Sequence, residues 1–227
     1  MERAHPEISW HTSVLPPATL RALDFFSKEA WLPGSWYLAG GTALALQVGH
    51  RISEDLDFFT PNKTFEPNSV LQYLSAPDWK SGRVEAGTVY GEYREAKVSF
   101  IAYPFFVPKE RMLAYGNVSM LTVRDIAVMK VIALSQRGSK RDFTDLYWYS
   151  KNREPLGDVL RRLPEQYPTV AHDYHHILKS FLYFPDAEDD PMPRLNFQAD
   201  WEEIKAYFRL EVPRIAEELL GLRKEGA

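Results

Sequence analysis

The chain has 227 residues, 45% of them hydrophobic, which is enough for one large core or two smaller cores packed together. Its formal net charge of -4 at pH 7 excludes a globally basic nucleic-acid coat, although a local basic patch is compatible with it. The absence of cysteine excludes disulfides, thiolate zinc sites and cysteine nucleophiles. The segment MERAHPEISWHTSVLPP lacks the apolar region of a signal peptide, and no apolar run reaches the roughly 18 residues of a membrane span. We therefore expect a soluble, cytoplasmic protein.

The first half of the chain alternates helical and strand-like segments. Apolar residues at helical intervals predict an amphipathic helix over residues 19–32, and the apolar, aromatic segment SWYLAG predicts a buried strand after it. A second helix is expected over residues 42–50, followed by the strand DLDFF. The elements expected next are a helix over residues 68–75 and two or more antiparallel strands within residues 83–93 and 96–103.

From Thr122 onward, helical periodicity dominates. The expected helices lie within residues 122–136, 141–151, 157–167, 175–184 and 201–221. Residues 108–121 have no clear period and separate the two halves. We therefore predict an α+β fold, in which a mixed-sheet domain over residues 1–115 is followed by a helical domain over residues 116–227 that contributes a second part of the active site.

Two aspartates in the strand DLDFF form the first candidate site. Asp55 and Asp57 lie at alternate positions, so their carboxylates project from the same face and repel each other unless a cation lies between them. Mg²⁺ suits such a pair, because it binds one or two carboxylates and completes its shell with water and phosphate oxygens. The preceding Gly40-Gly41-Thr42 turn opens a helix, where backbone N–H groups can approach a triphosphate. This order of elements predicts a phosphate-and-metal site.

Each part of this pattern also has a simpler interpretation. A lone Gly-Gly pair is usually a turn, and a lone Asp-x-Asp is more often a solvated strand end than a metal site. A calcium loop is disfavoured, because Leu56 and Phe58 interrupt the ladder of oxygen ligands that an EF-hand needs. The combination, in this order and spacing, favours the functional interpretation.

The segment RGSKRDFTDLYWY is a second polar cluster. It places two acids, Asp142 and Asp145, three residues apart on a predicted helix, where they can share one face. Asp142 can equally be the acid of a capping-box-like helix start at Ser139. Asp145 lies deeper in the helix, where capping is no alternative, and is the better candidate for chemistry.

Together these motifs carry a family resemblance. Gly40-Gly41-Thr42 followed by Asp55-x-Asp57 resembles the signature of the DNA polymerase β-type nucleotidyltransferase superfamily. More narrowly, LAGGTALALQVGHRISEDLDFF, DIAVMK, RGSKRDFTDLY and LYFPDAEDDPMPRL together resemble the AbiEii/MenT toxin nucleotidyltransferases, over roughly residues 36–201. The resemblance implies a nucleotidyltransferase fold and a bacterial toxin of a toxin–antitoxin or abortive-infection system. Some members of that family transfer nucleotides to tRNA 3′ ends.

In such a reaction, Asp55 and Asp57 would be catalytic and would hold Mg²⁺ or Mn²⁺ against the triphosphate of an NTP. The residues expected to bind the nucleotide are Gly40, Gly41, Thr42, Arg51, Ser53 and Lys130. The cations expected to contact acceptor phosphates are Arg137, Lys140 and Arg141, with Arg161 and Arg162 as further candidates. Lys130 and Ser53 have structural alternatives, as a core-edge lysine and a loop cap.

Superfamily members commonly add a third carboxylate from a later strand, which deprotonates the acceptor hydroxyl. The corresponding strand here, AKVSF, offers Ser99 instead of an acid. The AbiEii/MenT resemblance suggests that the Lys-Arg-Asp-x-x-Asp motif supplies this function, with Asp145, and secondarily Asp142, as catalytic residues. Asp145 would be the base or would orient the acceptor.

Two other functions stay open. One is a kinase-like toxin that transfers a phosphoryl group with the same acids, and the other is a catalytically silent nucleotide- or protein-binding module. The expected partners are an NTP, an RNA acceptor such as tRNA, and a cognate antitoxin, with no membrane. The histidines His172, His175 and His176 are interpreted as a solvated helix face, because no acid partner is evident for a metal site.

Overall fold

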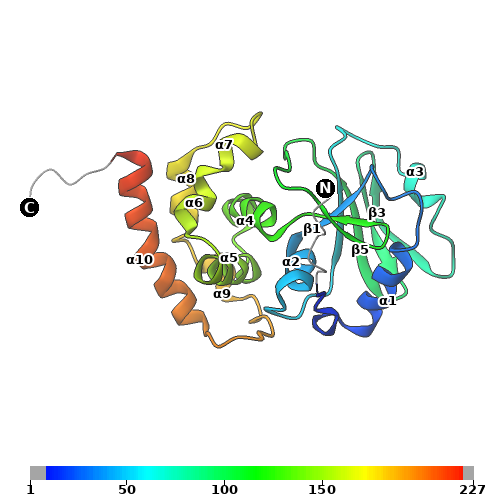
Figure 1. Ribbon diagram of the computed structural model, residues 1–227, viewed down its shortest axis with the longest axis horizontal. Coiled ribbons are helices and arrows are strands. Elements are labelled where there is room, and N and C mark those ends of the chain that lie inside the picture. The colour runs from blue at the N-terminus through cyan, green and yellow to red at the C-terminus, as the bar shows by residue number, and fades with distance from the viewer. Residues whose placement is uncertain (1–8, 222–227) are drawn as a thin grey trace, which may run out of the picture.

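In the computed structural model, which describes residues 9–221, a mixed β-sheet with its flanking helices lies beside a group of helices (Figure 1). Within those residues the sheet has seven strands in the order β3-β4-β5-β2-β1-β7-β6. The strands are β1 (Tyr37–Ala39), β2 (Leu56–Thr60), β3 (Trp79–Glu85), β4 (Thr88–Tyr93), β5 (Ala96–Ala102), β6 (Leu113–Tyr115) and β7 (Val118–Met120). The predicted α+β class, a mixed sheet followed by helices, is confirmed.

The helices of the sheet half are η1 (Thr12–Val14), α1 (Pro17–Phe26), α2 (Gly40–Val48) and α3 (Asn68–Leu71), of which η1 is a 3₁₀ turn. The first long helix, α1, ends at Phe26, earlier than predicted, where the Ser27 hydroxyl donates to the Asp24 carbonyl at 2.9 Å. The Phe26 ring packs 5.0 Å from that of Phe58 on β2 and 5.9 Å from that of Phe100 on β5. One face of the sheet is therefore an aromatic core under α1.

Strand β2 is flanked by β1 and β5. Strand β1 runs antiparallel to β2 with Ala39 opposite Asp57, and β5 runs parallel to β2 with Ser99 opposite Asp57. The antiparallel strands predicted within residues 83–93 and 96–103 are present. β3 and β4 form a hairpin that turns at Gly87, whose φ is 75°, and β3 begins at Trp79, before the predicted range. The sheet thus brings the glycine turn after β1, the aspartate strand and Ser99 side by side.

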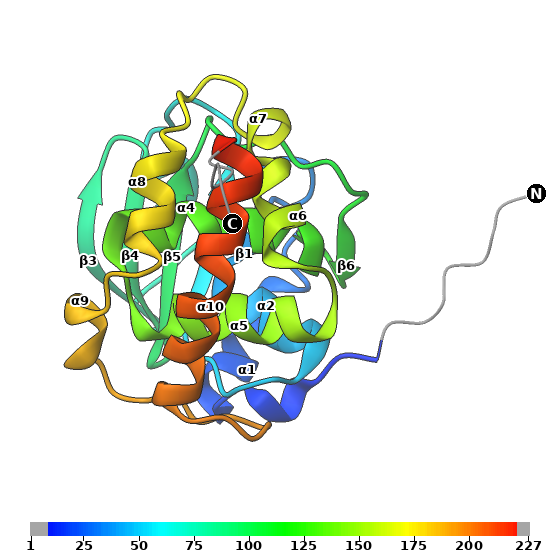
Figure 2. The same ribbon diagram turned by 90° about the vertical axis from the view of Figure 1, so that its left-hand side faces the viewer.

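The helical half consists of α4 (Val123–Arg137), α5 (Lys140–Asn152), α6 (Leu156–Arg161), α7 (Leu163–Gln166), α8 (Tyr174–Ser180), α9 (Pro185–Glu188) and α10 (Trp201–Leu220). The last helix, α10, crosses the outer side of this half (Figure 2). It starts at a capping box, in which the Asp200 carboxylate accepts from Glu203 N at 2.8 Å and the Glu203 side chain accepts from Asp200 N. Phe208 on α10 packs edge-on against Phe143 on α5, with ring centroids 5.1 Å apart.

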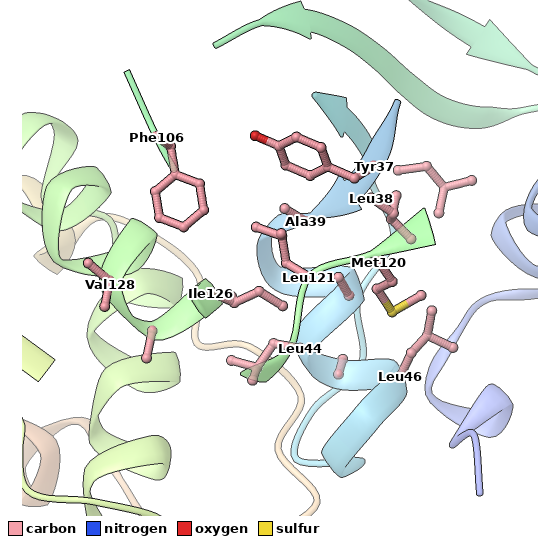
Figure 3. Close-up of a cluster of buried hydrophobic side chains, with 14 of the residues drawn as sticks. Tyr37, Leu38, Ala39, Leu44, Leu46, Phe106, Met120, Leu121, Ile126 and Val128 are labelled. Atoms are coloured by element: carbon pink, nitrogen blue, oxygen red, sulfur yellow. The ribbon is translucent and has the colours of Figure 1, made fainter. Parts of the chain in front are cut away.

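The two halves share a packed junction. Buried side chains of β1, α2 and α4, including Leu38, Leu44 and Ile126, face one another there (Figure 3). The β6–β7 hairpin joins the sheet through a parallel pairing of β7 with β1, so the sheet continues to Met120, past residue 115. The division into two domains stays a prediction. Among residues 9–221, no helix has both the length and the apolar character that crossing a bilayer requires.

Candidate active site

Asp55 immediately precedes β2 and Asp57 is its second residue. Their spacing of two residues places both carboxylates on one side of the sheet, where they line a common cavity. Ser99 Oγ donates a hydrogen bond of 2.5 Å to Asp57 Oδ1 from the neighbouring strand. Burial raises the pKa of Asp57; the hydrogen bond from Ser99 lowers it and the charge of Asp55 raises it. A divalent cation would stabilise both ionised carboxylates, so the pair fits such an ion chemically.

The glycine turn lies directly against this pair. Gly40 has a φ of +74°, and a Cβ there would lie 3.1 Å from Asp57 Oδ2. A Cβ on Gly41 would lie only 2.2 Å from Arg51 Nη2. Gly41 is therefore required by the close approach of the buried Arg51 side chain, and Gly40 by its left-handed backbone. Because the turn forms the N-terminus of α2, its free N–H groups are suited to bind an anion beside the carboxylates.

Thr42 joins the turn to the aspartate loop. Its hydroxyl lies 2.8 Å from Ser53 Oγ and donates a bond of 2.5 Å to the Asp55 carbonyl. Both hydroxyl residues are buried. These contacts indicate that Thr42 and Ser53 hold the backbone of Asp55 in place. For Ser53, they favour the structural alternative of a loop cap.

A buried ionic network lies beneath the turn, centred on Asp145 of α5. The Asp145 carboxylate accepts from Arg51 Nε at 2.6 Å and Arg51 Nη2 at 2.9 Å. It also contacts His50 Nε2 at 2.8 Å and Lys130 Nζ at 2.7 Å. Burial opposes ionisation of Asp145, but Arg51 and Lys130 outweigh it and hold the pKa well below its ordinary value. Asp145 is therefore an ionised anchor for the cations under the turn.

Asp142 extends the network by a second set of contacts. Its carboxylate accepts from Lys130 Nζ at 2.7 Å and Arg137 Nε at 2.7 Å, and the Ser139 hydroxyl donates to it at 2.8 Å. Burial again opposes ionisation, and the positive charges of Lys130 and Arg137 lower the pKa of Asp142. Lys130 thus bridges both aspartates, and its ammonium group is already held by two carboxylates.

These contacts bear on the roles expected from the sequence. Asp142 and Asp145 are fully buried and ionised, and a carboxylate with a lowered pKa is a weak base. The geometry thus favours a positioning role for both. Lys140, expected at the acceptor, is also buried, and its ammonium donates to the carbonyls of Glu188 at 3.1 Å and Asp190 at 2.5 Å. The structure assigns Lys140 to holding the segment after α9, which corrects the acceptor-binding expectation for this residue.

The other predicted site residues, except Arg161 and Arg162, meet in one cavity of about 400 Å³, which we call the first cavity. Arg161 instead pairs with Asp158 and Glu218, and Arg162 pairs with Glu154. Its polar lining consists of Gly40, Gly41, Thr42, Arg51, Ser53, Asp55, Asp57, Tyr90, Tyr103, Lys130, Gln136, Arg137 and Arg141. Its apolar lining consists of Phe59, Ile101, Ile126, Met129 and Ala133. Arg141 is more than half exposed, and its Nη1 lies 3.2 Å from Asp55 Oδ2. The cavity therefore combines an anion-binding turn, cations, carboxylates and apolar walls, as a nucleoside triphosphate requires.

Residues 194–196, which we call the strap, pair with the loop of residues 50–52 that carries Arg51. Asn196 N donates to the His50 carbonyl at 2.8 Å, and Ile52 N donates to the Arg194 carbonyl at 2.9 Å. Arg194 lies at the end of the motif LYFPDAEDDPMPRL, and Asn196 is the first residue beyond it. The strap holds Arg51 between two backbone pairings, so this motif supports the site without lining it.

The histidines of the helical half lie elsewhere. His172 Nε2 lies 3.1 Å from the Tyr167 carbonyl, and His176 Nε2 lies 3.3 Å from the Ser135 carbonyl. Among residues 9–221, no group of three or more His, Cys, Asp or Glu side chains is arranged to hold a metal. The aspartate pair is thus a two-carboxylate site, with Ser99 where a third acid could stand.

Comparison with protein families decides the assignment. The model of the family described as nucleotidyl transferase AbiEii toxin, type IV toxin–antitoxin system, matches residues 26–77 and 93–219. This chain belongs to that family. It is accordingly a nucleotidyltransferase of a toxin system, and the resemblance inferred from its motifs is confirmed.

Individual relatives are similar over most of the chain. An uncharacterized protein of Aquifex aeolicus is 34% identical over 189 residues, which cover 80% of this chain and 88% of that protein. A proposed nucleotidyltransferase from H. pylori shares the fold at 20% identity and a TM-score of 0.53, covering 92% of this chain and all of that chain. The MenT4 nucleotidyltransferase toxin of Mycobacterium tuberculosis is 17% identical, with a TM-score of 0.49 over 81% of this chain and 80% of that chain.

The residues of this AbiEii-family site that were not expected from the sequence include His50 and Tyr90. His50 contacts Asp145, and burial lowers the pKa of His50, so the neutral ring is favoured there. Tyr90 on β4 lines the first cavity although it is distant in sequence from every motif. Alternation within TVYGEY could have placed Tyr90 on a strand face, but only the pairing of β4 with β5 brings it to Asp57.

Ser99→Ala is expected to lower kcat of nucleotidyl transfer by roughly 10- to 100-fold, because the hydroxyl orients one oxygen of Asp57. The unfolding free energy should change by only about 1 kcal/mol, the net value of one hydrogen bond. Steady-state kinetics and urea denaturation would measure the two effects. Ser99→Thr, which keeps the hydroxyl, is the control; equal activity of Ser99→Ala and the native protein would contradict the orienting role.

Proposed function

We propose that this AbiEii-family protein transfers NMP from an NTP to a hydroxyl of an RNA acceptor, with a tRNA 3′ end as the leading candidate, and that it requires Mg²⁺ or Mn²⁺. The observation that carries the proposal is the Asp55/Asp57 pair abutting the Gly40 turn within one cavity. A divalent ion bound there would neutralise the triphosphate and the departing pyrophosphate. As the toxin of a type IV system, the protein is expected to have a cognate antitoxin.

The chain's own groups supply position and charge. The N–H groups of the Gly40-Gly41 turn would bind phosphate oxygens, and Arg137 and Arg141 would neutralise phosphate charge from the cavity rim. Arg51 lies under the turn, where its bond to Asp145 fixes it. In the transfer, a bond forms between the acceptor oxygen and the α-phosphorus while the α–β phosphoanhydride bond breaks. Pyrophosphate leaves, and the hydroxyl proton passes to solvent.

Incubation with total cellular RNA and each α-³²P-labelled NTP tests the acceptor class. The expected result is labelled material that ribonuclease destroys and protease leaves intact, with labelling confined to the 3′-terminal nucleotide. Label that survives ribonuclease and is removed by protease would overturn the RNA assignment. The Asp57→Asn variant, purified in the same way, serves as the control for contaminating polymerases.

Metal removal is expected to abolish transfer, because two ionised carboxylates alone repel an incoming triphosphate. After dialysis against EDTA, label incorporation should fall at least about a hundredfold, and Mg²⁺ or Mn²⁺ should restore it. EDTA saturated beforehand with Mg²⁺ is the matched control. Full activity in excess chelator would contradict metal dependence and leave the family assignment untouched.

A further inference from the structure

A second cavity of about 550 Å³ adjoins the first at the aspartate pair. Its lining consists of Asp55, Asp57, Lys80, Ser81, Gly82, Tyr90, Gly91, Glu92, Lys97, Val98 and Ser99. Asp55, Asp57 and Tyr90 line both cavities. The carboxylates therefore stand at the boundary between two spaces, each within the size range of small-molecule and cofactor sites.

The two cavities extend from β2 in different directions. The glycine turn of the first cavity follows β1, which pairs with one side of β2. The lining residues of the second cavity come mainly from β5, β4 and β3, which continue the sheet from the other side of β2 to its edge. In an in-line transfer, the attacking and leaving oxygens lie on opposite sides of the α-phosphorus. With the triphosphate at the turn, the second cavity is placed for the acceptor.

Cross-strand pairing gives this cavity a continuous polar floor. Lys80 pairs with Glu92, and Glu92 pairs with Lys97, while Tyr90 pairs with Ser99 next to Asp57. Alternation places all of these side chains on one face, because Tyr90 and Glu92 are two residues apart, as are Lys97 and Ser99. The opposite face is the aromatic core under α1. This floor runs from the carboxylate pair to β3, the strand at the edge of the sheet.

The floor has the chemistry of a single-stranded nucleic-acid site. Lys80 and Lys97 are exposed on either side of one acid, Glu92, and Tyr90 is 40% exposed beside Asp57. Ammonium groups contact phosphates, and an exposed aromatic ring can stack on a base of any sequence. The hairpin end adds an ion pair between Arg83 and Glu85 at 2.7 Å, which leaves no net charge there.

Most of the hairpin that supplies Lys80 and Tyr90 lies outside the family match. The family model matches residues 26–77 and 93–219 and passes over residues 78–92, which hold most of β3 and β4. The catalytic carboxylates lie inside the matched region, whereas much of the second cavity's wall lies outside it. A segment outside the family match that borders carboxylates inside it is suited to select the acceptor.

We propose that the second cavity binds the 3′-terminal nucleotides of a single-stranded RNA acceptor, with Tyr90 stacked on a base and Lys80 and Lys97 on phosphates. The inference rests on the proposed nucleotidyl transfer and locates the binding site of its acceptor. It separates the two substrates: the NTP occupies the first cavity and the RNA end the second. Arg137 and Arg141, which line the first cavity but not the second, then belong to the NTP.

Direct RNA binding tests this without requiring transfer. The probe is a fluorescein-labelled single-stranded RNA oligonucleotide with a free 3′ hydroxyl, measured by anisotropy at several salt concentrations. The Lys80→Gln/Lys97→Gln double variant should bind it about tenfold more weakly, with a shallower salt dependence by roughly one unit of slope. The matched control, Lys28→Gln/Lys151→Gln, removes the same charge from exposed lysines outside both cavities and should bind RNA like the native chain.

Aromatic stacking is tested separately at Tyr90. Tyr90→Ala should weaken RNA binding roughly tenfold, and Tyr90→Phe should restore most of it, because stacking needs the ring and not the hydroxyl. Affinity for a fluorescent NTP analogue should stay within about twofold of native in the lysine double variant, whose residues lie outside the first cavity. Thermal unfolding would confirm that each variant is folded.

Three results overturn the proposal: no RNA binding by the native chain, equal loss in both double variants, or equal affinity in all variants. Label transfer to a protein acceptor with native RNA binding absent would leave nucleotidyl transfer standing and remove this inference. Selective loss of RNA binding without any transfer by the native chain would support the inference and remove the proposed reaction.

Discussion

Asp57→Asn is expected to lower kcat of nucleotidyl transfer at least about a thousandfold while leaving the protein folded. The carboxylate lies between Ser99 and the Gly40 turn, and losing its charge removes several kcal/mol of transition-state stabilisation at the triphosphate. Burial disfavours the ionised form of Asp57 in the folded chain, so a neutral amide should keep or slightly raise the unfolding free energy. Single-turnover label transfer and urea denaturation measure the two effects.

The control for this prediction is Glu54→Gln. Glu54 is exposed, immediately precedes Asp55, and lines neither cavity, so its substitution removes the same charge from the same loop. The kcat of this variant should stay within about threefold of native, as expected for an exposed charge in high dielectric. Equal rates for Asp57→Asn and the native protein would show that the reaction centre lies elsewhere.

Asp145→Asn is expected to lower the unfolding free energy by about 3–5 kcal/mol, because it leaves the buried Arg51 charge without its carboxylate partner and Lys130 with one carboxylate instead of two. Activity should fall as well, since Arg51 lies against Gly41 and shapes the turn. Denaturant titration gives the stability, and kcat measured under fully folded conditions gives the activity. A positioning residue should lose both together.

The comparison variant is Asp158→Asn, which breaks an ion pair with Arg161 in which both side chains are about half exposed. That pair should contribute at most about 1 kcal/mol. If Asp145→Asn instead kept native stability and lost only kcat, Asp145 would be a chemical base. The sequence-based interpretation would then hold over the structural one.

The local chemistry of the site could be predicted from the sequence, because its signals are short-range. Strand alternation aligned Asp55 and Asp57, and the glycine pair marked a turn at the start of a helix, where the structure has the N-terminus of α2. The sequence also indicated that Ser99 stands where a third acid is common, and the register places Ser99 directly opposite Asp57. Each of these depends on residues within one element or on a single strand pairing.

The partners of the buried cations could not be predicted, because they depend on contacts between distant segments. Arg51 and Asp145 are 94 residues apart in the chain, so no sequence spacing indicates their bond. Nothing in the sequence distinguishes Lys140 from a surface lysine, yet its ammonium group donates to two carbonyls at the end of α9 and just after it. The place of Tyr90 depended on recognising β3 and β4 as a hairpin, which weak alternation in residues 79–85 obscured.

The most direct measurement of the central claim compares ATP labelled at the α-phosphate with ATP labelled at the γ-phosphate, and the other three NTPs likewise, in reactions with RNA and Mg²⁺. Nucleotidyl transfer at the Asp55/Asp57 site predicts that, with the native protein, the α-label enters the RNA and the γ-label leaves as pyrophosphate. With Asp57→Asn, neither product should form. Entry of γ-label into the acceptor would contradict nucleotidyl transfer and indicate a kinase instead. Equal α-labelling by the native protein and Asp57→Asn would contradict the site.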